Sequence, residues 1–364
     1  MASVFSKNLN IYNAKQFKES VSEPSPSNVY ITFGKVAPWN NDSAPDAAST
    51  SVVSNYDIWK NIVGGKKIVG NNIKHVVPRH DWAANTVYYA YNDLADSPSM
   101  MNDTTAFYVL TDQWNVYKCL ANNYGANSTV KPTTVSTTTD FQTSDGYIWK
   151  YITTLTSAEQ LNFVTSDFIP IKTLEVSDGS LQWDVQQNAI DGAIHSILVT
   201  NTGSGYTDNN ISVIINGDGT EANAYAVRNV TTNTISSIVI DSKGINYTFA
   251  NVSFVSTSGT SAVARAVMAP PGGHGADPVA ELGGSYLMVS VDLIADENDV
   301  FITNNDFRQV ALIEDPKHYG TSNVMSNTLF SQLTTFTLNG TSVEYTEDEI
   351  VYQGNSLANA TFKG

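Results

Sequence analysis

Apolar and polar residues alternate with a period of two along much of this chain, which is the spacing of β-strands. The segments that show it are short, rich in β-branched and aromatic residues, and bounded by Asn, Asp and Gly. They cover residues 29–35, 114–120, 145–155, 285–293 and 300–316. Within 147–152, tyrosine and tryptophan occupy one face and Ile-Lys-Ile the other. We therefore predict a mainly β fold in which this strand lies between two layers.

Helical periodicity is confined to a few short segments. Residues 8–22 form the first, and the prolines of the following SEPSPSN end it. A second helix is predicted for TSAEQLNFV, where Thr156 and Glu159 have the spacing of a capping box. These helices are too short and too few to change the predicted fold class.

A third helix is predicted for residues 54–65. Ser54 is its predicted N-cap, Asp57 favours its positive end, and Gly64 and Gly65 are expected to stop it. Its apolar residues are expected to form one face. That face comprises Ile58, Trp59, Ile62 and Val63.

A duplication occupies the middle of the chain. His195–Thr207 matches Ser236–Thr248, and each copy reads as strand, Gly-x-x-Tyr-Thr turn, strand, Gly-Thr turn, strand. We predict a small β-domain at residues 190–270, built from two three-strand units and inserted between the parts at 1–189 and 271–364.

The glycines of TGSGYTD at 202–208 resemble a phosphate-binding loop, but the pattern fails in two ways. Asp208 occupies the place of the third glycine, and the following residues predict a strand instead of a helix. The second copy has Asn246 where the first has Gly205. These positions are therefore predicted to supply turns with positive φ.

Two clusters could in principle carry chemistry. The first could form an acid–base or metal site or, alternatively, a polar loop with a solvated histidine; it contains His274, Asp277 and Glu281. The second lacks the spacing of known zinc motifs, which favours a turn at Pro78 with Trp82 packed inward; it contains His75, His80 and Asp81. No pattern requires a metal or cofactor, so we expect none.

Composition narrows the function classes. The chain has 364 residues and a net charge of −16, which argues against nucleic acid and against an anionic membrane surface as partners. Its one cysteine, Cys119, is expected to be a buried strand residue without a disulfide. The first residues lack an apolar segment, so no signal peptide is expected. No small-molecule substrate and no enzymatic activity are predicted.

Several motifs occur in an order that resembles a known family. They are NVYITFGKVAPWNND, VVPRHDWAANT, VYKCL, SDGYIWKYI and NNDFRQVALIEDP, spread over residues 1–175 and 275–320. The chain resembles the gene product eight family, the baseplate wedge subunits of T-even-type contractile-tailed bacteriophages. That resemblance implies a layered β-sandwich with helix-bearing side loops, and a chain that forms a homodimer. It also implies a structural, late protein of the virion. Such a protein is made in the host cytoplasm and binds other baseplate wedge proteins.

If the protein acts through interfaces, aromatic side chains are the expected anchors. The candidates are Phe33, Trp39, Trp82 and Phe307, each of which could equally fill a core. A carbohydrate-binding tail adhesin that uses residues 190–270 remains an alternative. Tyrosines such as Tyr88, Tyr89 and Tyr91 could stack on sugars or fill a sheet interface. A glycoside hydrolase is a weaker alternative, because no particular pair of carboxylates stands out.

Overall fold

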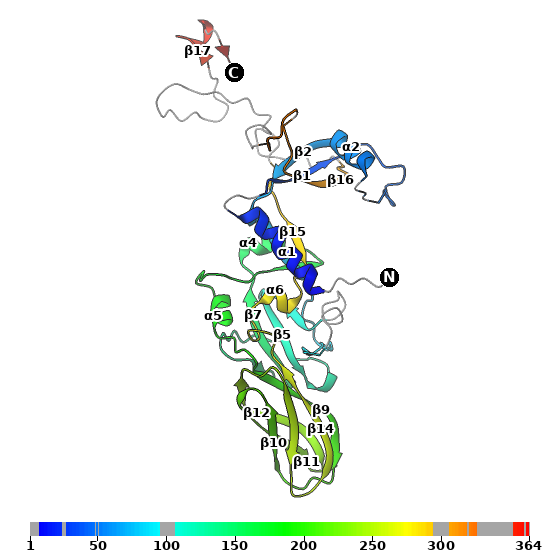
Figure 1. Ribbon diagram of the computed structural model, residues 1–364, viewed down its shortest axis with the longest axis vertical. Coiled ribbons are helices and arrows are strands. Elements are labelled where there is room, and N and C mark those ends of the chain that lie inside the picture. Colours follow the sequence, from blue (N-terminus) through cyan, green and yellow to red (C-terminus); the bar gives the residue numbers. More distant parts are fainter. Residues whose placement is uncertain are drawn as a thin grey trace. The chain divides into compact units, whose positions relative to one another are not determined.

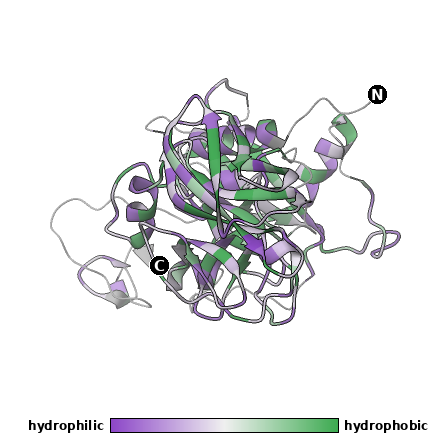
Figure 2. Cartoon of the chain, turned by 90° about the horizontal axis from the view of Figure 1, so that it is seen from below, coloured by the Kyte–Doolittle hydropathy of each residue, from purple (hydrophilic) through white to green (hydrophobic). Residues whose placement is uncertain are grey.

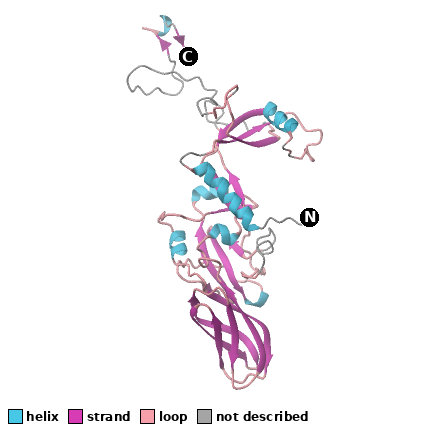
Figure 3. Ribbon diagram, in the orientation of Figure 1, coloured by secondary structure: helices cyan, strands magenta, loops and turns pink. Residues whose placement is uncertain are grey.

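The computed structural model describes residues 7–23, 27–47, 49, 51–94, 106–293, 306–318, 320–325, 352–359 and 362–363. The chain divides into two compact units, Met1–Asp315 and Pro316–Gly364. Strands dominate the first unit, and they form antiparallel sheets accompanied by a few short helices (Figures 1 and 3). The predicted mainly β fold class is confirmed.

The first unit contains a four-stranded sheet in the order β4-β5-β7-β6. Its strands are β4 (Tyr108–Leu110), β5 (Asn115–Asn122), β6 (Phe141–Gln142) and β7 (Tyr147–Thr154). The aromatic side chains of β7 enter one buried cluster, whereas Ile152 enters another on the opposite face. The prediction that this strand lies between two layers is therefore confirmed.

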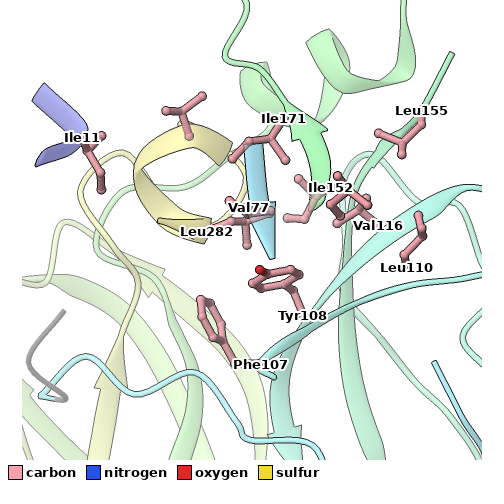
Figure 4. Packing of buried hydrophobic residues seen from close by; sticks show 12 residues of the cluster. Ile11, Val77, Phe107, Tyr108, Leu110, Val116, Ile152, Leu155, Ile171 and Leu282 are labelled. Atoms are coloured by element: carbon pink, nitrogen blue, oxygen red, sulfur yellow. The ribbon is translucent and has the colours of Figure 1, made fainter. Parts of the chain in front are cut away.

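A three-stranded sheet, in the order β15-β3-β8, supplies the facing layer. Its strands are β3 (Ile73–Pro78), β8 (Phe168–Ile171) and β15 (Tyr286–Val289). Val77 and Ile169 of this sheet share a core with Val116 and Ile152 of the four-stranded sheet (Figure 4). Two helices contribute to the same core, α1 (Lys7–Ser22) through Ile11 and α6 (Pro278–Leu282) through its apolar residues.

Two further helices support the central layers. In α4 (Ser157–Phe163), Thr156 and Glu159 form the predicted capping box. The sequence analysis did not predict α5 (Leu181–Gln187), whose Val185 packs against the aromatic face of the four-stranded sheet. Among the described residues, no helix is both long enough and apolar enough to cross a membrane.

A second three-stranded sheet has the order β16-β1-β2. Its strands are β1 (Val29–Gly34), β2 (Ile62–Lys67) and β16 (Gln309–Glu314). Residues 306–314 of the segment predicted at 300–316 are described and contain β16, while 300–305 lie outside the described residues.

The helix predicted at 54–65 requires correction. The observed helix, α2, spans Val52–Asn61, and Ser51 is its N-cap in place of Ser54. Gly64 and Gly65 do not stop the helix, because they lie inside β2. The predicted apolar helix face is also wrong, because Ile62 and Val63 lie in β2, and no residue of α2 is buried.

The duplicated region forms one six-stranded antiparallel sheet (Figure 1). The first copy gives β9 (Ile194–Ser204), β10 (Asn210–Gly217) and β11 (Thr220–Asn229), and the second gives β12 (Thr234–Ile245), β13 (Ala250–Val255) and β14 (Thr260–Met268). Their order is β12-β11-β10-β13-β14-β9, so the first strand of each copy pairs with the third strand of the other. Alternate hydrophobic positions from all six strands share one core, and Figure 2 shows the mixture of hydrophobic and hydrophilic positions along the strands.

Equivalent tyrosines close the two halves of this sheet. Tyr206 donates its backbone N–H to Asn233 at 3.0 Å, and Tyr247 donates to Gly192 at 3.2 Å. Gly205 and Asn246, at the equivalent turn position, have φ of 77° and 61°. A strand follows each turn, so the prediction of turns in place of a phosphate loop is confirmed. The strand pattern predicted for each copy is also confirmed, while the boundaries 190–270 as a separate domain stay a prediction.

The second unit contains a short hairpin of its own. Strand β17 (Tyr352–Gln353) pairs with β18 (Phe362–Lys363), and a 3-10 turn at Leu357–Asn359 lies between them. A bridge joins Lys317 to Val324 near the start of this unit.

Candidate interaction surface

Three of the four predicted interface aromatics lie together beside the β16-β1-β2 sheet. Phe33 and Phe307 contact edge to face, with ring centroids 5.0 Å apart. Phe307 also lines a pocket with Trp39. The sheet register explains this proximity: Gly34 pairs with Gln309, so residues that follow β1 lie next to residues that precede β16.

The pocket is open and has a volume of about 610 Å³. Its lining residues are Trp39, Asp42, Pro45, Asp306, Phe307 and Arg308. Arg308 bonds to Asp42 at 3.1 Å and to Asp306 at 2.8 Å, and it donates to the carbonyl of Val36. Its side chain is 20% exposed, against 47% and 75% for the two carboxylates. The carboxylates therefore form the exposed rim, and the guanidinium lies beneath them.

Two further contacts fix the wall of the pocket. The ammonium of Lys35 lies 4.2 Å from the ring centroid of Trp39, a cation–π contact. The backbone N–H of Trp39 donates to Asp42 at 2.7 Å. This hydrogen bond, followed by the hydrogen bond and charge of Arg308, lowers the pKa of the Asp42 carboxyl, so this carboxyl stays ionised at neutral pH.

An apolar sheet face adjoins the pocket; we define it as Ile31, Phe33, Val310 and Leu312. Pairing places Phe33 opposite Val310 and Gly64, and Ile31 opposite Leu312. A Cβ on Gly64 would lie 2.6 Å from the Phe33 ring, so only glycine lets that ring lie flat across β2. Val310 is 67% exposed and Leu312 is 53% exposed.

Trp82, the fourth predicted anchor, lies elsewhere. Its indole N–H donates to the hydroxyl of Ser128 at 3.2 Å, and its ring packs on the aromatic cluster of the four-stranded sheet. The structure therefore confirms the prediction that Trp82 packs inward. The interface role of all four aromatics stays a prediction.

The first polar cluster of the sequence analysis has a different character from the one expected. His274 is buried, so the alternative of a solvated histidine is wrong. Glu281 forms a buried ion pair with Lys118, 2.7 Å from nitrogen to oxygen, and its other oxygen accepts from the backbone N–H of Gly275. Asp277 is the N-cap of α6 and pairs with Lys15 on α1. These carboxylates therefore hold the chain together.

The same cluster continues into the six-stranded sheet. Asp140 bonds to His195 at 3.0 Å and to Lys243 of β12, and the His195 ring contacts the ring of His274. Burial lowers the pKa of both histidines, and the nearby charge of Lys118 lowers that of His274 further. Burial opposes ionisation of Asp140, but the hydrogen bond from His195 and the charges beside it hold its pKa below the usual range. The cluster fastens β9 and β12 to the four-stranded sheet.

The described residues contain no group of three or more His, Cys, Asp or Glu side chains arranged to hold a metal. His75 is buried and bonds to the carbonyl of Gly284, and Asp81 accepts from Arg79 in the turn after Pro78. Cys119 is buried in β5, and burial raises the pKa of its thiol, which makes it a poor nucleophile.

The aromatic residues weighed for sugar stacking are divided between core and surface. Tyr88 is buried, Tyr91 packs against Lys118 and His274, and Tyr89 is exposed. Within the described residues 194–268, Phe249 is the exposed aromatic side chain. A sugar-binding platform normally combines several such rings, so no observation favours the adhesin alternative over the wedge resemblance.

Sequence reasoning missed the Lys118–Glu281 pair, whose members are 163 positions apart. A signal was present, because Lys118 and Lys150 each interrupt an otherwise apolar strand. Lysine is almost never fully buried without a partner. The two lysines also pair with each other across β5 and β7, which places like charges side by side and requires carboxylates nearby.

The antiparallel sheets and the few short helices define a mainly β protein. Comparison with known proteins is more specific. Residues 3–140 match the family model described as Bacteriophage T4, Gp8. The chain is also 24% identical over 216 residues to the baseplate wedge protein gp8 of Enterobacteria phage T4, which covers 50% of this chain and 63% of that protein.

The resemblance predicted from the motifs is therefore confirmed, and it is strongest in the first part of the chain. The matched residues include β1, α2, β2 and Trp39. The six-stranded sheet lies beyond them. The alignment spans less than two thirds of the relative's length.

Proposed function

We propose that this chain is a structural component of a bacteriophage tail baseplate wedge and acts through contacts with other proteins. The observation that carries the proposal is the match of residues 3–140 to the Gp8 family, together with the similarity to a protein named as a baseplate wedge protein. Three residues of the pocket lining, Trp39, Asp42 and Pro45, and two strands of the adjoining sheet, β1 and β2, lie within the matched residues. In this role the protein needs no catalytic centre, cofactor or small-molecule substrate.

The proposal has finer parts. The protein is made in the host cytoplasm as a late protein, enters the virion at the baseplate of a contractile tail, and binds other wedge proteins. It forms a homodimer, as the family resemblance implies. A net charge of −16 favours partners or partner segments that carry basic residues.

Co-expression of the complete chain with the other wedge proteins of the same phage tests the proposal. We expect a complex of fixed stoichiometry that survives size-exclusion chromatography. Light scattering on the chain alone tests the homodimer. If no pairing gives a complex and tails assembled without this chain have complete baseplates, the proposal is wrong.

A further inference from the structure

We infer that the pocket and the apolar sheet face together bind a segment of another wedge protein, one that presents a large apolar side chain flanked by lysine or arginine. This inference rests on the proposed function and deepens it, because it names a surface and the chemistry of its partner. We call the combined area the docking surface. It consists of the pocket lining and the apolar sheet face defined above.

The two parts of the docking surface are continuous. Phe307 lines the pocket, its ring contacts Phe33, and Phe33 pairs with Val310 on the sheet face. A bound segment can therefore place a side chain in the pocket and lie along exposed Val310 and Leu312. Burial of apolar surface of this kind releases water on binding, and this release favours association.

Charge identifies the flanks of the bound segment. Both cations near the pocket already have partners, Arg308 with two carboxylates and Lys35 over the Trp39 ring. The exposed oxygens at the rim belong to Asp42 and Asp306, since these side chains are more exposed than the guanidinium that they share. A lysine or arginine side chain on the partner would form ion pairs with these carboxylate oxygens, which otherwise face water.

The same rim argues against a second copy of this chain as the occupant. A two-fold contact would place the docking surface against itself, so the carboxylates of one rim would face those of the other. The proposed homodimer must then use another surface. The matched residues include β1, Trp39 and Asp42, so one side of the docking surface lies in the part of the chain that matches the Gp8 family model, while β16 and the residues before it lie outside that match.

Substitutions in the complete chain test the inference in the co-expressed complex. Val310→Asp adds a charge to the sheet face, and Asp306→Lys reverses the rim. We expect each to weaken the complex at least tenfold, and Asp306→Lys to reduce its salt dependence as well. Matched controls are Leu161→Asp on α4, where the leucine is 84% exposed, and Asp241→Lys, an exposed position of β12. Both controls should bind within twofold of the parent chain.

Hydrogen exchange on the unmodified complex gives an independent reading that does not depend on folding of the variants. Protection should appear at residues 31–42 and 307–312. If the complex forms but protection lies elsewhere, or if both docking-surface variants bind like the parent, this inference is wrong while the proposed function stands. If the chain alone is a dimer that Val310→Asp dissociates, the occupant is a second copy and the inference is also wrong. If the parent chain forms no complex with any wedge protein, both the proposed function and this inference are wrong.

Discussion

Strands β7 and β16 have the same kind of alternating sequence and opposite environments. In β7, Trp149 and Ile152 point to opposite faces and both are fully buried, because a layer covers each side. In β16, Val310 and Leu312 share one face and remain largely exposed. Alternation thus predicts a strand in both cases, but the neighbouring layers decide whether its apolar residues stabilise the chain or remain available to a partner.

The largest expected effect is in the covered strand. Trp149→Ala should lower the free energy of unfolding by about 4 kcal/mol, because it removes a buried ring that stacks on Tyr147 and contacts Tyr88. Trp59→Ala on α2, where the ring is 51% exposed, is the matched control and should change it by less than about 0.5 kcal/mol. Urea denaturation followed by circular dichroism measures both. Equal losses would contradict the comparison.

The buried ion pair gives the next effect. Lys118→Met should destabilise by about 3 kcal/mol, because it leaves the buried Glu281 carboxyl group without the ammonium 2.7 Å away. Lys66→Met at an exposed position of β2 is the control, with an expected loss below about 0.5 kcal/mol. Adding Glu281→Leu to Lys118→Met should recover part of the loss. A double variant less stable than the single one would show that the carboxylate acts through its bonds to Gly275 and Asp277 instead.

Local signals predicted the elements whose causes are local. The Thr156–Glu159 capping box and the alternating strands follow from neighbouring residues, and the duplication is visible as repeated sequence. The predicted start of α2 was wrong because serine is a favourable N-cap residue, and Ser51 caps the helix where Ser54 was predicted to do so. Its end was wrong for a tertiary reason: Gly64 lies in a strand where the Phe33 ring needs the space of a missing side chain.

The candidate site was predictable only in part. Phe33, Trp39 and Phe307 could be chosen as aromatics near predicted strands, but their proximity depends on pairing between residues about 280 positions apart. Nothing local distinguishes them from Trp82, whose indole is satisfied by Ser128. The rim around Arg308 was missed because its carboxylates come from separate segments.

Acid should weaken the covered region before it affects the exposed sheet. Burial lowers the pKa of His75, His195 and His274 below the ordinary value of 6.5. Below pH 6.5 the unfolded chain therefore binds protons that the folded chain does not, and stability falls as pH falls. The loss is at most about 1.4 kcal/mol per histidine for each pH unit.

Urea denaturation at pH 7.5 and 5.5 measures this loss. His274→Gln should reduce the difference between the two pH values, whereas His318→Gln, at an exposed position of the second unit, should leave it unchanged. Stability that is the same at both pH values would show that these imidazoles accept protons in the folded chain as readily as in water.

The smallest expected effect is the sharpest test of the exposed face. Leu312→Ser removes a larger apolar group than Ile152→Val does, yet it should cost less than about 0.5 kcal/mol, because a 53% exposed leucine loses little contact with water on folding. Ile152→Val in β7 should cost about 1 kcal/mol, since it leaves a gap in a closed core. Denaturation curves of the two variants, measured side by side, decide the order. If Leu312→Ser proves the more costly, this face is covered within the folded chain and is not available to a partner.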